Sequence, residues 1–253
     1  MGHTPYMDIH IGFHWYTGRK IREKGYVFFY PYSMCWNADI SLNTFLFGCF
    51  ALIFIYYTNT YTRYKSTAYE QPIAYLWSFL FVLMQLLEYF IWKNIKNHKR
   101  NTFLSKLGVF LIVSQLYVLI LFAQPVYYSI LLAIYTLFFF SVYLYKSTYN
   151  PFVFKTMVSP NGHLSWEWGR FDGKERPILW ISLLLYLIPW LLAKRTPYTV
   201  LLIGGITFLI GYILLQKENT YGSMWCWMIN VIFLFTLIDI LLVQPFREYN
   251  GLC

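Results

Sequence analysis

The chain has 253 residues, of which 58% are hydrophobic, 23% aromatic and only 12% charged, whereas about 25% of the residues of a soluble domain are charged. Its four cysteines have no C-x-x-C spacing and form no disulfide framework, and its basic residues are scattered over several loops, which excludes a nucleic-acid recognition fold. We therefore expect an integral membrane protein with no separate soluble domain.

Residues 1–37 precede the first apolar run and are expected to form a cytoplasmic tail. Asp8–Tyr16 alternates apolar with polar residues, and Tyr26–Tyr30 is a second apolar stretch, so a short β-hairpin is predicted here. His10 and His14 would lie about 13 Å apart on one strand, too far to share a metal ion. The tail is therefore not predicted to bind a metal.

Seven apolar runs follow, each with a length close to the ~20 residues that a helix needs to cross a bilayer. They predict an all-α membrane protein, a seven-transmembrane-helix bundle within residues 38–246. Gln124-Pro125 separates the third run from the fourth and predicts a tight helical hairpin, because proline cannot continue the preceding helix. The predicted spans are about 40–58, 73–92, 103–123, 126–145, 177–193, 198–216 and 224–245.

The distribution of Lys and Arg predicts the orientation of the bundle. With seven spans, 15 of these residues fall on the side of the N-terminus and 5 on the other side. Cytoplasmic loops of membrane proteins carry the excess of Lys and Arg, so we expect the N-terminus in the cytoplasm and the C-terminus outside. The expected partners are the lipid bilayer and anionic lipid headgroups on the cytoplasmic side.

In this orientation, unusual polar and sulfur-containing residues gather at the cytoplasmic half of the bundle. Gln85 and Glu88 share a helix face because they are three residues apart, and Cys226 and Asn230 do so at four apart. Ionisable residues inside a membrane usually face the bundle interior, which predicts a polar pocket open to the cytoplasm with Glu88 at its floor. The candidate pocket residues are Cys35, Ser41, Gln85, Glu88, His163, Trp166, Ser223, Trp225, Cys226 and Asn230.

Because the polar residues of the first, second and seventh spans lie at the same depth in the membrane, we predict that these three spans are neighbours. Glu88 should then lie within one hydrogen bond, or one water, of a polar group such as Ser223 or Asn230. The alternative interpretation is that Gln85 and Glu88 only join helices through hydrogen bonds.

The residues of the predicted spans do not match two known chemistries of seven-span proteins. A rhodopsin needs a Schiff-base lysine in its last span, and 224–245 contains none. Membrane zinc hydrolases need several histidines near the inner leaflet, where only His163 is well placed. Cys35, Cys226, His163 and Glu88 would in principle form a zinc site, or Cys35 and His163 a nucleophile and its base, but their spacing is non-local. No metal site is predicted, and the cofactor stays open.

Four short segments resemble a family of small bacterial multi-pass membrane proteins with relatives in large DNA viruses, whose function is uncharacterised. They are Met34–Ser41 (MCWNADIS), Gln85–Glu88 (QLLE), Gly162–Trp166 (GHLSW) and Gly222–Trp227 (GSMWCW). The resemblance covers about Met34 to Leu242 and departs from the family pattern at Asn37, which replaces Ser, and in the residues before Met34. It implies one shared site containing Cys35, Ser41, Gln85, Glu88, His163, Trp225 and Cys226.

These observations predict a membrane protein that binds or moves a small polar ligand or a proton through a cytoplasm-facing pocket. One alternative is a membrane-embedded enzyme with a Cys/His/Glu site, and another is a structural membrane scaffold of viral type. The sequence favours the first and leaves the ligand, the membrane and the oligomeric state open.

Overall fold

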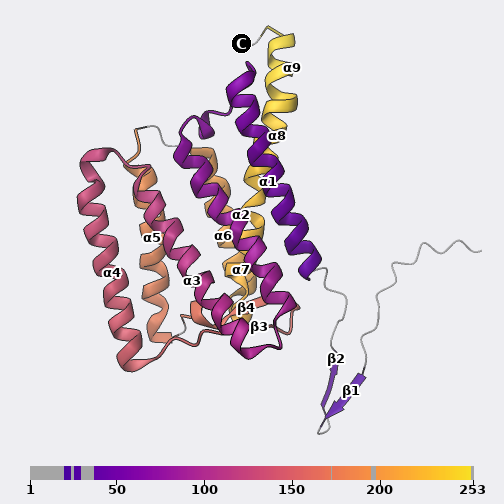
Figure 1. Ribbon diagram of the computed structural model, residues 1–253, viewed down its shortest axis with the longest axis vertical. Helices are drawn as coiled ribbons and strands as arrows, with labels where there is room; N and C mark the ends of the chain where they lie inside the picture. Colours follow the sequence, from indigo (N-terminus) through magenta and orange to yellow (C-terminus); the bar gives the residue numbers. More distant parts are fainter. Residues whose placement is uncertain (1–19, 24–25, 30–36, 172, 195–197, 252–253) are drawn as a thin grey trace, which may run out of the picture.

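The long apolar runs form helices that pass alternately up and down beside one another (Figure 1). This computed structural model describes residues 20–23, 26–29, 37–171, 173–194 and 198–251. The helices are α1 (Ala38–Tyr61), α2 (Pro72–Lys93), α3 (His98–Ile120), α4 (Tyr128–Tyr149), α5 (Arg176–Leu191), α6 (Tyr198–Leu215), α7 (Tyr221–Met228), α8 (Asn230–Ile238) and α9 (Gln244–Tyr249).

Short elements connect these helices. The 3-10 turns are η1 (Thr67–Tyr69), η2 (Pro125–Tyr127), η3 (Glu167–Gly169), η4 (Gly173–Glu175) and η5 (Gln216–Glu218). A π-helical turn, η6 (Asp239–Val243), joins α8 to α9. The strands are β1 (Lys20–Glu23), β2 (Tyr26–Phe29), β3 (Thr156–Val158) and β4 (Leu164–Trp166).

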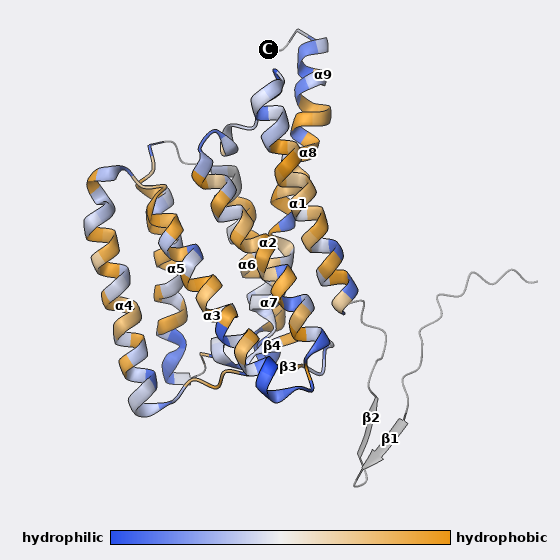
Figure 2. Cartoon of the chain, in the orientation of Figure 1, coloured by the Kyte–Doolittle hydropathy of each residue, from blue (hydrophilic) through white to orange (hydrophobic). Residues whose placement is uncertain are grey.

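Six helical segments of the described chain are long and apolar enough to cross a membrane. Their outward faces are apolar, as Figure 2 shows, and carry side chains such as Ile53, which is 70% exposed, and Leu214, which is 71% exposed. Soluble surfaces rarely expose so much apolar area, so these faces support a multi-pass membrane protein. The predicted all-α fold class is confirmed. The six segments are Ala38–Tyr61, Pro72–Lys93, His98–Ile120, Pro125–Tyr149, Leu201–Glu218 and Tyr221–Tyr249.

The predicted fifth span, 177–193, corresponds to α5, which is shorter than these six. Its 16 residues give a length of about 24 Å, less than the roughly 30 Å hydrocarbon core. The end of α5 nevertheless meets the turn between α3 and α4, because the Gln124 N–H donates to the Leu192 carbonyl at 3.1 Å and Ala123 pairs with Ala193. Six candidate spans and one shorter apolar helix thus occupy the places of the seven predicted spans.

Two predictions about helix neighbours are confirmed. The chain turns between α3 and α4 at Gln124-Pro125, where η2 starts. Helix α1 packs against α2 and α8, and α2 packs against α7, so the first, second and last long helices adjoin. Gly48 permits the close approach of α1 to α2, since a Cβ there would lie 2.6 Å from Val82 Cγ2.

The helices after residue 220 form one continuous rod whose C-terminal part is tied to the loop between α1 and α2. In η6 the Asp239 carboxylate accepts a hydrogen bond of 2.7 Å from Gln244 Nε2, which also donates to the Lys65 carbonyl at 3.0 Å. Beyond it, the Glu248 carboxylate accepts from the Tyr64 hydroxyl at 2.6 Å and pairs with Arg63. Asp239 therefore has a hydrogen-bond partner in the same rod.

The long loop between α4 and α5 contains a β-hairpin that the sequence did not predict. Strands β3 and β4 are antiparallel, with Thr156 opposite Trp166. Residues 159–163 form the turn, where Gly162 has φ of 82°, a conformation that favours glycine. All three residues of β4 are buried, and Figure 1 places the hairpin at the end of the bundle where α3 begins.

Side chains of helix α3 hold this hairpin by hydrogen bonds to Thr156. The Asn101 side chain donates to the Thr156 carbonyl at 3.0 Å and accepts from the Thr156 N–H at 2.9 Å. The Ser105 and Thr156 hydroxyls are 2.9 Å apart. All three residues are buried, so these bonds satisfy polar groups that have no access to water.

A second hairpin lies in the N-terminal tail, where β1 pairs with β2 in antiparallel register. Strand β2 overlaps the predicted stretch Tyr26–Tyr30, but its partner is Lys20–Glu23. The predicted first strand, Asp8–Tyr16, lies outside the described residues.

We expect Asn101→Ala to detach the β3–β4 hairpin and destabilise the protein. Both bonds to Thr156 are lost, and each backbone group left buried and unpaired costs about 1–3 kcal/mol. Thermal unfolding in detergent measures the effect, with Asn250→Ala as control, because the exposed Asn250 amide bonds only to the Phe246 carbonyl of its own helix. Equal melting temperatures for the two variants would contradict the role of Asn101 in holding the hairpin.

Candidate functional site

The polar residues of α2 lie on its buried face. Gln85 is 1% exposed and Glu88 is 3% exposed, and their spacing of three residues places them on one side of the helix. Gln85 Nε2 and Glu88 Oε1 have no hydrogen-bond partner among the described residues. An unsatisfied donor and an unsatisfied acceptor therefore stand one helical turn apart inside the bundle.

Helix α7 supplies the neighbours of Glu88. The Ser223 side chain is placed to hydrogen-bond with the Glu88 carboxyl, as the sequence predicted. Cys226 is buried three residues further along α7 and interacts electrostatically with Glu88. The structure thus brings together Glu88, Ser223 and Cys226, which come from the second and the last long helices.

The polar groups continue from Cys226 toward the middle of the bundle. Tyr186 of α5 interacts electrostatically with Cys226, and its hydroxyl donates to Gln115 Oε1 at 3.0 Å. Gln115 of α3 is fully buried, and its Nε2 donates to the Leu80 carbonyl at 3.4 Å. Tyr186 was missed by the sequence analysis, because one tyrosine within an apolar run of an aromatic-rich chain gives no signal of a polar role.

Two tryptophans of the hairpin segment cover this end of the bundle. The rings of Trp166 and Trp168 stack with centroids 4.9 Å apart and an angle of 13° between their planes. Glycines accommodate them, since a Cβ at Gly222 of α7 would lie 3.0 Å from the Trp166 ring and a Cβ at Gly108 of α3 would lie 3.0 Å from Trp168. Both indole N–H groups are buried without a partner among the described residues.

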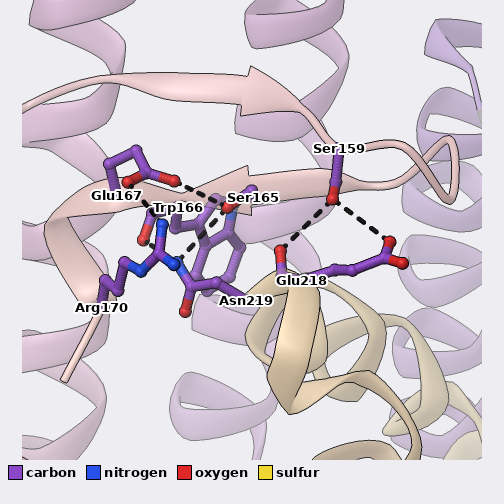
Figure 3. A network of polar contacts seen from close by, with 7 residues as sticks. All are labelled: Ser159, Ser165, Trp166, Glu167, Arg170, Glu218 and Asn219. Carbon is purple, nitrogen blue, oxygen red and sulfur yellow. Dashed lines mark hydrogen bonds and ion pairs between the residues drawn. The ribbon is translucent and has the colours of Figure 1, made fainter. Parts of the chain in front are cut away.

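The turn of the hairpin is bonded to the segment before α7. The Glu218 carboxylate accepts from the Ser159 hydroxyl at 3.3 Å, as Figure 3 shows. It also accepts from the Asn161 backbone N–H at 3.0 Å. Asn161 Nδ2 donates to the Thr220 hydroxyl at 2.9 Å. These bonds hold the turn against the start of α7.

Strand β4 is bonded to the same segment. Asn219 Nδ2 donates to the Trp166 carbonyl at 2.8 Å and to the Ser165 hydroxyl at 3.3 Å, as Figure 3 shows. The Ser165 hydroxyl donates to Glu167, which pairs with Arg170. Asn219 has φ of 54°, a left-handed conformation that asparagine tolerates better than most residues.

His163 belongs to this hairpin network. His163 is 7% exposed, and its backbone N–H donates to Asn161 Oδ1 at 3.0 Å. Burial lowers the pKa of the His163 imidazole below its ordinary value of 6.5, and the nearby Glu218 carboxylate acts in the opposite direction. The charged neighbour that raises the pKa of His163 therefore belongs to the segment before α7 and is not Glu88.

The remaining predicted pocket residues make other contacts or are only known to be buried. Ser41 is buried on α1. Trp225 donates its indole N–H to the Gly204 carbonyl of α6 at 3.1 Å. Asn230 donates to the Trp227 carbonyl of its own chain segment, and its Oδ1 has no partner among the described residues. Cys35 lies outside the described residues.

Glu88 and Gln85 do not line any of the five cavities described in the structure. Both residues are buried. Lys106, a potential cationic partner for Glu88, is exposed and lies over the Phe154 ring. In the described part of the chain, no group of three or more His, Cys, Asp and Glu residues is arranged to hold a metal ion.

A buried ion pair at the hairpin end was also missed by the sequence analysis. Lys146 Nζ of α4 lies 2.6 Å from Glu175 Oε2, and Asn150 Nδ2 donates to Glu175 Oε1 at 2.9 Å. Lys146 is 4% exposed and Glu175 is 6% exposed. In the sequence Lys146 counts only as one of the basic residues of a cytoplasmic loop, because nothing local identifies a partner 29 residues later.

We expect His163 to make hairpin docking sensitive to acid. Because its folded-state pKa is lowered, its stabilising contribution is present above pH 6.5 and is lost as the pH falls through the lowered value. Thermal unfolding from about pH 7.5 to about pH 5 should therefore show a falling melting temperature, and His163→Gln should flatten the curve. The exposed His98→Gln serves as control and should keep the wild-type curve; a His163→Gln curve equal to wild type would refute the role.

No family model, curated protein or solved structure matches the chain. The resemblance in Met34–Ser41, Gln85–Glu88, Gly162–Trp166 and Gly222–Trp227 therefore stays a prediction. Three of these segments meet in the structure, since Trp166 packs on Gly222 and Glu88 lies beside Ser223. The function has to be inferred from this geometry.

Proposed function

We propose that the chain crosses the membrane seven times, with its N-terminus in the cytoplasm, and that Glu88 binds and releases a proton or a small polar ligand on the cytoplasmic side. The orientation is supported by the 15 to 5 distribution of Lys and Arg. A seventh crossing by α5 is supported by its apolar composition and by the contact of its last residues with the α3–α4 turn. Local thinning of a bilayer accommodates a short span at modest cost.

The burial of Glu88 is the observation that carries the functional proposal. A carboxylate at the centre of a membrane helix costs roughly 2.5–3.5 kcal/mol on insertion scales. No lysine or arginine of the described chain forms an ion pair with Glu88. A proton is the simplest ligand that would offset this cost, and a small molecule with both a donor and an acceptor is the next.

The unsatisfied groups favour this function over a scaffold. A purely structural polar cluster would have its hydrogen bonds satisfied, because an unpaired buried group costs about 1–3 kcal/mol. Here Glu88 Oε1 and Gln85 Nε2 both lack partners among the described residues. The two atoms offer one acceptor and one donor to the same ligand.

Access to Glu88 from the cytoplasm would pass the β3–β4 hairpin. Trp166 and Trp168 stack over this end of the bundle, and polar bonds to α3 and to the segment before α7 hold the hairpin in place. On this proposal an open form of the site arises when the hairpin moves away and water replaces these bonds.

A membrane-embedded enzyme is the second candidate, favoured by the Cys226 thiol near Glu88. In that function Glu88 would act as a base toward the thiol. Cys226→Ala separates the two proposals, because it removes the nucleophile but keeps the carboxyl.

We expect Glu88→Gln to leave the protein folded and to abolish proton binding. Infrared spectra of the protein in bilayers should show the C=O band of a protonated carboxylic acid, which shifts on transfer to D₂O because the proton exchanges. Glu88→Gln should lack this band, whereas Glu70→Gln, at an exposed carboxyl, and Cys226→Ala should keep it. A band that survives Glu88→Gln, or one that never exchanges, would defeat the proposal.

The orientation predicts which cysteines react from outside the cell. Cys253 should be labelled by a membrane-impermeant thiol reagent added to intact cells, and Cys35 should be labelled only after the membrane is permeabilised. Variants that retain one of these two cysteines, with Cys49 and Cys226 replaced by Ala, give unambiguous signals. Labelling of Cys35 in intact cells would reverse the orientation.

A further inference from the structure

A cavity of about 400 Å³ lies between α5, α6 and the α7–α8 rod. Its volume is within the ~300–1,000 Å³ range of ligand pockets. The walls are almost entirely apolar and belong to residues of the helices themselves, including Trp77, Tyr186, Trp190, Phe208 and Trp225. The residues that line the cavity include neither Glu88 nor any residue of β3 or β4.

Aromatic rings hold the walls of the cavity in fixed positions. Trp77 meets Trp190 edge to face at a centroid distance of 5.3 Å. Trp225 meets Tyr186 at 5.7 Å and Phe208 at 5.5 Å in the same geometry. Edge-to-face pairs favour one relative orientation of the rings, so the cavity is preformed.

Two glycines of α6 create the hollow. A Cβ at Gly205 would meet no atom within 4 Å, and a Cβ at Gly204 would meet only Ile229 Cδ1, at 3.9 Å. Helices α5 and α6 are not among the closely packed helix pairs of the structure. The space between them is therefore not filled by the chain itself.

The length of the cavity matches one leaflet of a bilayer. Its walls extend from Leu201 to Leu209 on α6 and from Trp180 to Trp190 on α5. At 1.5 Å per residue these stretches are about 12 and 15 Å long, roughly half of a 30 Å hydrocarbon core. A ligand lying along them would occupy one leaflet.

Trp77 marks where the cavity lies along the bundle. The residue lines the cavity, but its indole N–H is buried and does not open onto it. Trp77 lies near the start of α2, at the end of the bundle opposite the β3–β4 hairpin (Figure 1). This end is near the membrane surface, where the ester carbonyls of lipids are found.

We propose that this cavity binds one acyl chain of a membrane lipid, from the leaflet opposite the hairpin. The chain lies between α5 and α6 against Phe208 and Trp225. The bilayer supplies this ligand at high local concentration, and the apolar walls exclude polar molecules. The assignment is independent of the proton or polar ligand proposed for Glu88.

Photo-crosslinking tests the proposal. The full-length protein is reconstituted into phosphatidylcholine vesicles that contain a small fraction of a phospholipid with a diazirine in one acyl chain, and labelled peptides are identified by mass spectrometry. Label should concentrate on residues 201–209 and 180–190. Gly205→Leu, which fills the hollow without a clash, should lower this labelling by about tenfold, equivalent to about 1.4 kcal/mol of binding.

Two further variants make the test decisive. Ile206→Phe enlarges a side chain that faces lipid outside the cavity, so it should leave the labelling unchanged. Gly205→Val places a smaller side chain in the same open space and should lower the labelling severalfold even if Gly205→Leu does not fold. Label spread evenly over all lipid-facing helices, or equal labelling of cavity positions in Gly205→Leu and Ile206→Phe, would overturn the proposal.

Discussion

The exclusion of water from the interior of a helical bundle is the constraint on which this structure depends. Every polar group that the chain places there must find a partner within the protein, because the surrounding hydrocarbon offers none. Asn101 meets the constraint by bonding both backbone groups of Thr156, and Lys146 meets it by pairing with Glu175. Glu88 and Gln85 meet it only in part, since Glu88 Oε1 and Gln85 Nε2 have no hydrogen-bond partner among the described residues.

The β3–β4 hairpin links this polar chemistry to the fold. It is held on one side by Asn101 of α3 and on the other by Glu218 and Asn219, so residues far apart in the sequence close the same end of the bundle. Its tryptophans fit against Gly108 and Gly222, where any side chain would displace the rings. The environment of Glu88 therefore depends on a loop as well as on the helices around it.

The sequence predicted the parts of this structure that arise from local patterns. Long apolar runs located the helices, the Gln124-Pro125 pair located a turn, and the shared depth of polar residues predicted that α1, α2 and the last helices adjoin. It did not predict the β3–β4 hairpin, whose strands have three residues each and carry no useful periodicity.

Partners far apart in the chain were equally out of reach of sequence reasoning. Tyr186 and Gln115 are separated by 71 positions, and hydropathy does not say which tyrosine of a run turns inward. The sequence therefore predicted that Glu88 lies beside Ser223. It did not predict that Tyr186 and Gln115 form a hydrogen bond nearby. The Trp225 indole bonds to the Gly204 carbonyl of α6, and the His163 backbone N–H bonds to Asn161 within the hairpin turn.

The π-helical turn at Asp239–Val243 has a consequence for how this chain tolerates change in length. A π turn accommodates one residue more than an α turn and aligns positions five apart, as Asp239 and Gln244 are. Removing one residue there would restore regular α-helix but rotate everything beyond it by about 100°. Glu248 would then swing away from Arg63 and Tyr64, and the C-terminal helix would lose its attachment to the α1–α2 loop. A single extra residue thus sets the rotational phase of the last turns of the protein.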